Sequence, residues 1–222
     1  MNFLEICQMV LDEADLAPDE LQDVRVTAEM PEQHRKVIAF VKRNYLAVQR
    51  EMPYWDFHQT SGVFLTTLTD ETQDYTVSNV RDLMRDSLRG RKVGQTAEWP
   101  IRYLTYAEWR DIFMINNSGT GIPLYLVELP DGQFRVEPKP TVACEVLADW
   151  TQTLHELRRK DDEPLWHKDY HELLVWMSLE DYASAFEVGD TLGQRIARNL
   201  PKIKLAFNQK FSPELEGAGG FM

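Results

Sequence analysis

The sequence predicts an α+β protein, in which a helical bundle (an N-terminal hairpin plus C-terminal helices) carries an inserted small antiparallel β domain. Apolar residues recur at helical spacing before residue 52 and again after residue 164. Between these regions, short runs of β-branched and aromatic residues alternate with turn signals. The expected divisions are 1–52 (N-terminal helical part), 53–160 (β-rich insert), 161–211 (C-terminal helices packing on the N-terminal ones) and 212–222 (C-terminal docking arm).

Two helices are predicted in the N-terminal part. In residues 2–14, Phe3, Ile6 and Val10 follow helical spacing. The second helix, 31–51, opens with a proline, which the first turn of a helix tolerates, and it ends before another proline. The apolar stripe of this second helix consists of Val37, Ile38, Val41, Tyr45 and Val48.

The middle of the chain predicts a mixed but mainly β region. Residues 80–89 fit a helix or a strand equally well, because their periodicity does not decide between the two. Thr105 and Glu108 have the spacing of a capping box, so a short helix is expected over 106–114, followed by a loop. The Asp131-Gly132 pair predicts a hairpin turn. The expected strands are 61–68, 75–77, 123–129, 133–138 and 142–150.

Helices are predicted again from Pro164 onward. The first is apolar over much of its circumference and therefore needs partners on more than one side. Gly189 is expected to end it, and a last helix is expected over 191–210, kinked or restarted at Pro201. The apolar residues of the first of these helices are Trp166, Tyr170, Leu173, Leu174, Trp176, Met177, Leu179 and Tyr182.

The charge of the chain limits the classes of partner. Its 222 residues carry 36 acidic and 24 basic side chains, a formal net charge of −12. A protein that binds free duplex DNA is expected to carry the opposite sign. The acidic balance suits either simple solubility or a wall that repels DNA. The N-terminal residues lack the basic start of a signal peptide, and no apolar run is long enough for a membrane span.

The residues with catalytic or metal-binding potential do not assemble into a site. His167 and His171 are four residues apart and would share a helix face, but the sequence supplies no third ligand at a recognisable spacing. An exposed, solvated first helical turn is the expected reading of both. Cys144 lies in an apolar alternation and is expected in the core, and with Cys7 it forms no metal-binding spacing. We therefore expect no cofactor, no metal and no enzymatic activity.

The C-terminal region has an unusual charge pattern. Between residues 191 and 213 there are five basic side chains and no acidic ones. On a helix, Arg195, Arg198 and Lys202 lie roughly opposite the apolar stripe, so they form either a solvated face or a strip that docks against an acidic neighbour. The five basic residues are Arg195, Arg198, Lys202, Lys204 and Lys210.

The end of the chain is predicted to be a docking arm. Residues 212–222 contain three glycines and no apolar periodicity, so they are expected to become ordered only when something holds them. A crystal contact or an internal fold-back are the alternatives. With the basic strip, Phe211, Phe221 and Met222 are the residues expected to contact a partner protein or a neighbouring copy of the chain.

A series of short motifs follows the predicted N-terminal helical hairpin. In chain order they are Tyr54-Trp55-Asp56, Gly121-Ile122-Pro123, Pro138-Lys139-Pro140, Asp161 to Pro164, and Tyr170 with Leu173 and Leu174. Over roughly residues 30–210, this order resembles the head-to-tail adaptor proteins of tailed bacteriophages, also called connector or tail tubular A-type proteins. The resemblance is one of order and spacing more than of identity. The chain departs from the pattern in a polar insert near Arg89–Glu98 and in a charged connection, Ala148–Lys160.

The resemblance implies a structural protein of the virion neck, assembled in the host cytoplasm. It implies a ring of twelve copies beneath the portal protein, which extends the DNA channel, lets genomic DNA pass without specific binding, and joins downstream tail or collar proteins. Another ring protein of the neck or tail, such as a collar or tail terminator, is the nearest alternative. A small cytosolic enzyme and a nucleic-acid module that uses the basic helix are the alternatives from other classes.

Overall fold

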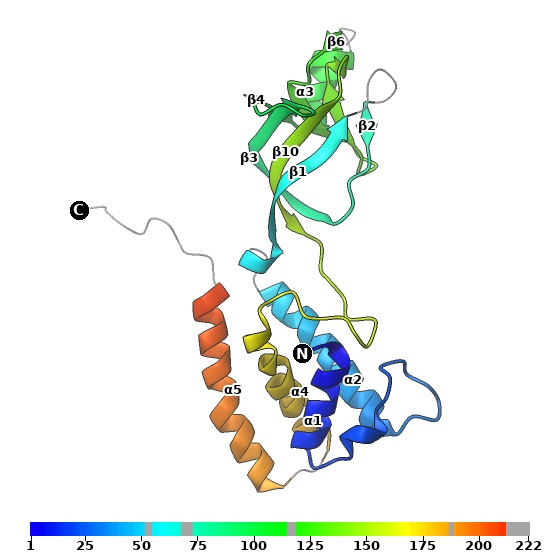
Figure 1. Ribbon diagram of the computed structural model, residues 1–222, viewed down its shortest axis with the longest axis vertical. Helices are drawn as coiled ribbons and strands as arrows, with labels where there is room; N and C mark the ends of the chain where they lie inside the picture. Colours follow the sequence, from blue (N-terminus) through cyan, green and yellow to red (C-terminus); the bar gives the residue numbers. More distant parts are fainter. Residues whose placement is uncertain (52–54, 68–72, 115–118, 187–188, 212–222) are drawn as a thin grey trace, which may run out of the picture. The chain divides into compact units, whose positions relative to one another are not determined.

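The computed structural model describes residues 1–51, 55–67, 73–114, 119–186 and 189–211. The chain forms two compact units: a helical unit from residues 1–58 and 154–222, and a β unit from residues 59–153 (Figure 1). The predicted α+β fold with an inserted β domain is confirmed. The insert is shorter than the predicted 53–160, because residues 55–58 and 154–160 belong to the helical unit.

The described part of the helical unit contains four α-helices. They are α1 (Phe3–Glu13), α2 (Glu32–Glu51), α4 (Glu172–Ala185) and α5 (Asp190–Phe211), with short 3₁₀ turns at Pro18–Glu20, Asp56–His58 and Lys168–Tyr170. The side chain of Asn2 caps α1 by accepting from the backbone N–H of Glu5, whose carboxylate accepts in return from the N–H of Asn2. Both N-terminal helices lie where the sequence predicts them.

Helix α4 is the centre of this unit, and it packs against α1, α2 and α5. Its buried residues, Leu173, Leu174, Val175, Trp176, Ser178, Leu179 and Tyr182, surround most of the helix. The prediction that this helix needs partners on several sides is confirmed, but α1, α2 and α5 of the same chain supply them. Contact with neighbouring copies is therefore not needed to bury α4.

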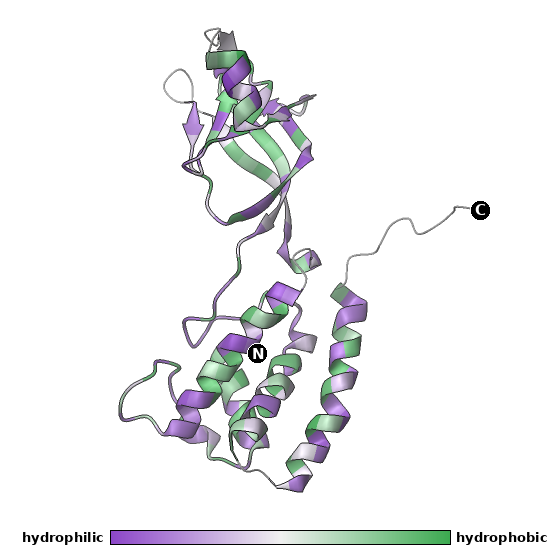
Figure 2. Ribbon diagram, turned by 180° about the vertical axis from the view of Figure 1, so that it is seen from behind, coloured by the Kyte–Doolittle hydropathy of each residue, from purple (hydrophilic) through white to green (hydrophobic). Residues whose placement is uncertain are grey.

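Helix α5 is amphipathic, and Figure 2 shows hydrophilic and hydrophobic segments alternating along it. It continues through Pro201 as one helix, so the predicted restart at this proline does not occur. Its buried residues are Leu192, Ile196, Phe207 and Phe211, and Leu200 and Ile203 are partly buried against the same core. This spacing of three and four residues places one stripe of α5 against the core of the unit.

In the residues that the structure describes, the β unit is built from two four-stranded sheets and one short pair of strands. The sheet orders are β1-β10-β3-β4, β2-β8-β7-β5 and β6-β9. Most neighbours are antiparallel, but β5 pairs with β7 and β6 with β9 in parallel, a departure from the predicted antiparallel domain. The strands are β1 (Gln59–Thr67), β2 (Asp74–Tyr75), β3 (Val80–Lys92), β4 (Glu98–Pro100), β5 (Arg102–Leu104), β6 (Thr120–Gly121), β7 (Tyr125–Glu128), β8 (Phe134–Glu137), β9 (Lys139–Pro140) and β10 (Cys144–Gln152).

Local sequence signals account for several of these elements. The predicted hairpin joins β7 to β8, with Gly132 at φ 81° in its turn. Thr105 and Glu108 form the predicted capping box of helix α3 (Tyr106–Trp109), which continues as a π-helical turn, Arg110–Met114. Cys144, the first residue of β10, is buried, as the apolar alternation around it predicts.

The structure resolves the ambiguity over residues 80–89 in favour of a strand. They form most of β3, which pairs with β10 along one side and with β4 along the other. Gly90 of β3 lies beneath the indole ring of Trp99, where an added Cβ would be 2.5 Å from ring atoms. This close approach is possible because glycine has no side chain.

Candidate partner-binding surface

The outer face of α5 carries the candidate surface. Arg198, Lys202 and Leu205 follow i, i+4, i+7 spacing and therefore lie along one side of the helix. All three are exposed, and Leu205 retains 60% of its accessible surface. We call these three residues the basic ridge. Among the residues that the structure describes, neither of its cations has an ion-pair partner.

Two of the five predicted basic residues are used inside the helical unit instead. Arg195 pairs with Glu13 at the end of α1. The Nζ atom of Lys204 lies 3.6 Å from a carboxylate oxygen of Glu51 at the end of α2. These two pairs link α5 to the C-terminal ends of α1 and α2. The positive charge left for a partner therefore resides in the basic ridge and in exposed Lys210.

The structure corrects the prediction for Phe211. Its side chain retains 8% exposure, and its ring contacts Phe57, Tyr170 and Phe207. It closes the core at the end of α5 and is not available to a partner. Phe221, Met222 and the rest of the predicted docking arm, 212–222, lie outside the described residues.

An aromatic cluster fixes α5 in the helical unit. Phe207 is 1% exposed, and its ring centroid lies 5.2 Å from that of Trp55, 5.3 Å from that of Trp166 and 4.8 Å from that of Phe211. The indole N–H of Trp55 donates to the backbone carbonyl of Val48 at 2.8 Å. This packing explains why the segment around Trp55 belongs to the helices and not to the β insert. Because this aromatic cluster holds one side of α5, it determines the direction in which the basic ridge faces.

The two histidines four residues apart have different environments. His167 is exposed and lies 3.2 Å from the carboxylate of Asp169, as a surface residue would. His171 is 1% exposed, so the prediction that it is solvated is wrong. Its Nε2 lies 3.0 Å from the carbonyl oxygen of Trp166, and its Nδ1 lies 3.0 Å from the amino group of Met1. Burial lowers the pKa of His171, consistent with a neutral ring that donates from Nε2 and accepts at Nδ1.

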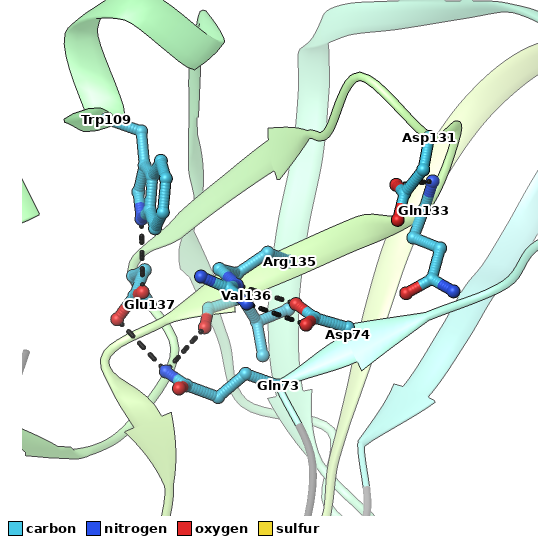
Figure 3. A network of polar contacts seen from close by, with 8 residues as sticks. All are labelled: Gln73, Asp74, Trp109, Asp131, Gln133, Arg135, Val136 and Glu137. Atoms are coloured by element: carbon cyan, nitrogen blue, oxygen red, sulfur yellow. Dashed lines mark hydrogen bonds and ion pairs between the residues drawn. The ribbon is translucent and has the colours of Figure 1, made fainter. Parts of the chain in front are cut away.

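A buried polar network ties α3 to the sheet of the β unit (Figure 3). Glu137 is 2% exposed, and its carboxylate accepts from the indole N–H of Trp109 and from the side-chain amide of Gln73, both at 3.1 Å. Nearby, the guanidinium of Arg135 makes two hydrogen bonds of 2.6 Å to Asp74 and stacks 4.9 Å from the Trp109 ring. Each of these charged groups has a structural partner, so the network stabilises the fold.

The hollows in the β unit are polar and are lined by residues with structural contacts. One, of about 470 Å³, is lined in part by Arg85, Tyr103 and Glu108. The guanidinium of Arg85 lies 4.4 Å from the Tyr103 ring centroid, and Glu108 caps α3. Within the described ranges, no three His, Cys, Asp or Glu side chains are grouped as metal ligands would be. None of the described helices is both long enough and apolar enough to cross a membrane.

A second surface of the helical unit was not anticipated from the sequence. The connection between α1 and α2, residues 14–31, contains five acidic side chains and Arg25 as its one basic residue. Together with His34 it lines a hollow of about 360 Å³, in which buried Leu21 lies beside Glu20 and Glu29. We call residues 14–31 the acidic loop. The local excess of acidic residues is visible in the sequence, but the overall negative charge of the chain made it inconspicuous.

Comparison with known proteins identifies no family: no family model matches the chain, and no curated protein is significantly similar to it in sequence.

Proposed function

We propose that this chain is a structural subunit of a ring in the neck of a tailed bacteriophage, the head-to-tail adaptor that its motif order resembles. The observation that carries the proposal is the basic ridge of α5. A strongly acidic chain presents two cations that pair with no carboxylate of the described residues, and an exposed leucine, on a helix whose other side is fixed by an aromatic core. Such a rigid, complementary surface is suited to docking against an acidic protein partner.

The acidic net charge supports the same role. A ring that surrounds passing DNA must not bind it, and an acidic lumen repels phosphates where a basic groove would release counterions and bind. The basic ridge alone is too small to reverse a formal charge of −12. A nucleic-acid module is therefore the weaker explanation of the ridge, and it predicts salt-sensitive DNA binding by the isolated chain.

In the proposed role, about twelve copies would form a ring that binds the portal above it and tail or collar proteins below it. Negative-stain electron microscopy of the full chain mixed with a phage portal tests this role. Rings stacked coaxially on the portal are the expected result. A monomer that does not bind the portal would contradict the proposal. Rings that stack only on tail components would favour a collar or tail terminator instead.

A further inference from the structure

We infer that the basic ridge of α5 binds the acidic loop of a neighbouring copy, so that the two surfaces join subunits head to tail. This inference rests on the proposed ring and names the contact that builds it. The partner is thus a second copy of this chain.

The positions of the two surfaces support a head-to-tail contact. In Figure 1 the connection between α1 and α2 projects from one flank of the helical unit, and α5 forms the opposite flank. Figure 2, the reverse view, shows the same separation. The acidic loop begins next to Glu13, which pairs with Arg195 of α5, but α4 packs against α5 on one side and against α1 and α2 on others, and the loop projects away from α5. Distinct surfaces on opposite flanks generate a heterologous contact, which closes into a ring when the rotation per subunit allows it.

The charges of the two surfaces are complementary. The acidic loop carries five carboxylates, from Asp15, Asp19, Glu20, Asp23 and Glu29, against the single Arg25. The basic ridge carries Arg198 and Lys202 with no acidic residue between them. Copies that each carry a net charge of −12 repel one another, and a local patch of opposite sign at the contact counteracts this repulsion. Helix α5 supplies such a patch in the helical unit.

The apolar parts of the two surfaces also fit. Leu205 is 60% exposed and lies one turn beyond Lys202 on the same side of α5. The hollow of the acidic loop has Leu21, Met30 and Pro31 in its lining, together with the charged residues Glu20, Asp23, Arg25 and Glu29. A leucine seated in this hollow would bring the two cations of the ridge to the carboxylates that surround it. Desolvation of the leucine would add affinity to a contact whose charges determine its direction.

Matched charge reversals test the contact. The basic-ridge variant is Arg198→Glu with Lys202→Glu, and the acidic-loop variant is Glu20→Lys with Glu29→Lys. All four residues are exposed, and circular dichroism should show both variants folded. Each variant alone should assemble about a hundredfold more weakly than the wild type, because like charges then face each other at every contact. Mixed in equal amounts, the two should assemble again, since each one restores the complement that the other lacks.

Light scattering after size-exclusion chromatography of the full chain measures the mass of the assembly that the wild type, each variant and the mixture form. A control variant, Arg159→Glu with Lys160→Glu, changes the net charge by the same amount at exposed sites of the same unit and should assemble as the wild type does. A basic-ridge variant that still forms rings, a control that fails equally, or a mixture that stays monomeric would each overturn the inference. Monomeric wild-type protein would instead contradict the proposed ring itself, so the two failures are distinguishable.

Discussion

Replacing Phe207 by alanine should remove the aromatic contacts that hold α5 against the core, and it is the most direct perturbation of the helical unit. The side chain is 1% exposed and is surrounded by aromatic rings, of which the nearest three have centroids within 5.3 Å. Truncation of a buried phenylalanine typically costs about 3–5 kcal/mol, from lost transfer free energy and from the cavity left behind. The rings around it belong to three separate segments of the chain, so the cavity cannot close by a single side-chain movement, and we expect a cost within this range.

Urea unfolding of the Phe207→Ala variant, followed by tryptophan fluorescence and by far-ultraviolet circular dichroism, measures this cost. Because the chain has two units, the unfolding transition of the helical unit must be separated from that of the β unit. Amide hydrogen exchange of α5 reports on the helical unit alone. Gln209→Ala is the matched control on the same helix. That glutamine is exposed and lies outside the basic ridge, so the unfolding free energy should change by about 0.5 kcal/mol or less. A Phe207→Ala variant that loses no more than the control would refute the proposed anchoring of α5.

Three further predictions concern packing, a buried carboxylate and pH. Gly90→Ala should destabilise the β unit by about 1–3 kcal/mol in urea unfolding, because the new Cβ would displace the Trp99 ring; an unchanged midpoint would contradict the close approach. Glu137→Gln should cost about 1–3 kcal/mol in the same assay, because an amide has one acceptor oxygen where the carboxylate uses two, one for the buried indole N–H of Trp109 and one for the side-chain amide of Gln73; equal stability would show that the network does not need the carboxylate. His171 has a folded-state pKa below its ordinary value of about 6.5 because it is buried, so the unfolded chain takes up the proton first as the pH falls. The stability of the helical unit should therefore decline as the pH falls below about 6.5, and a His171→Asn variant with an identical pH profile would contradict this.

Elements of both units were predictable where their signals are local. The apolar stripes of α1 and α2, the proline that opens α2 and the capping box of α3 each involve residues within a few positions of one another. The same is true of the hairpin turn between β7 and β8. In each case, the physical cause of the element is contained in a short window of sequence.

The failed predictions depended on contacts between distant residues. His171 was expected to be solvated because histidine in a polar first turn usually is, but the backbone carbonyl of Trp166 and the N-terminal amino group satisfy its ring. Phe211 ends an amphipathic helix, and only the positions of Phe57 and Tyr170 show that it is core. For residues 80–89, pairing with β10 and β4 selects a strand that periodicity alone could not select.

Only part of the candidate surface could be predicted from the sequence. The run of basic residues identified α5, but the sequence could not show that Arg195 and Lys204 are paired with Glu13 and Glu51. Those pairs reduce the five predicted cations to the basic ridge and the exposed Lys210. The acidic loop was hidden for a different reason: in a chain of this composition, carboxylates are common, and only their arrangement around a hollow opposite α5 distinguishes them.

Native mass spectrometry of the wild-type chain at increasing protein concentration tests the central claim most directly. A subunit of a closed ring should give one dominant assembly at a fixed integer multiple of the chain mass. Salt should dissociate that assembly, because exposed charges are screened within about 8 Å at physiological ionic strength. A chain that remains monomeric, or that adds copies without reaching a fixed number, would contradict the account.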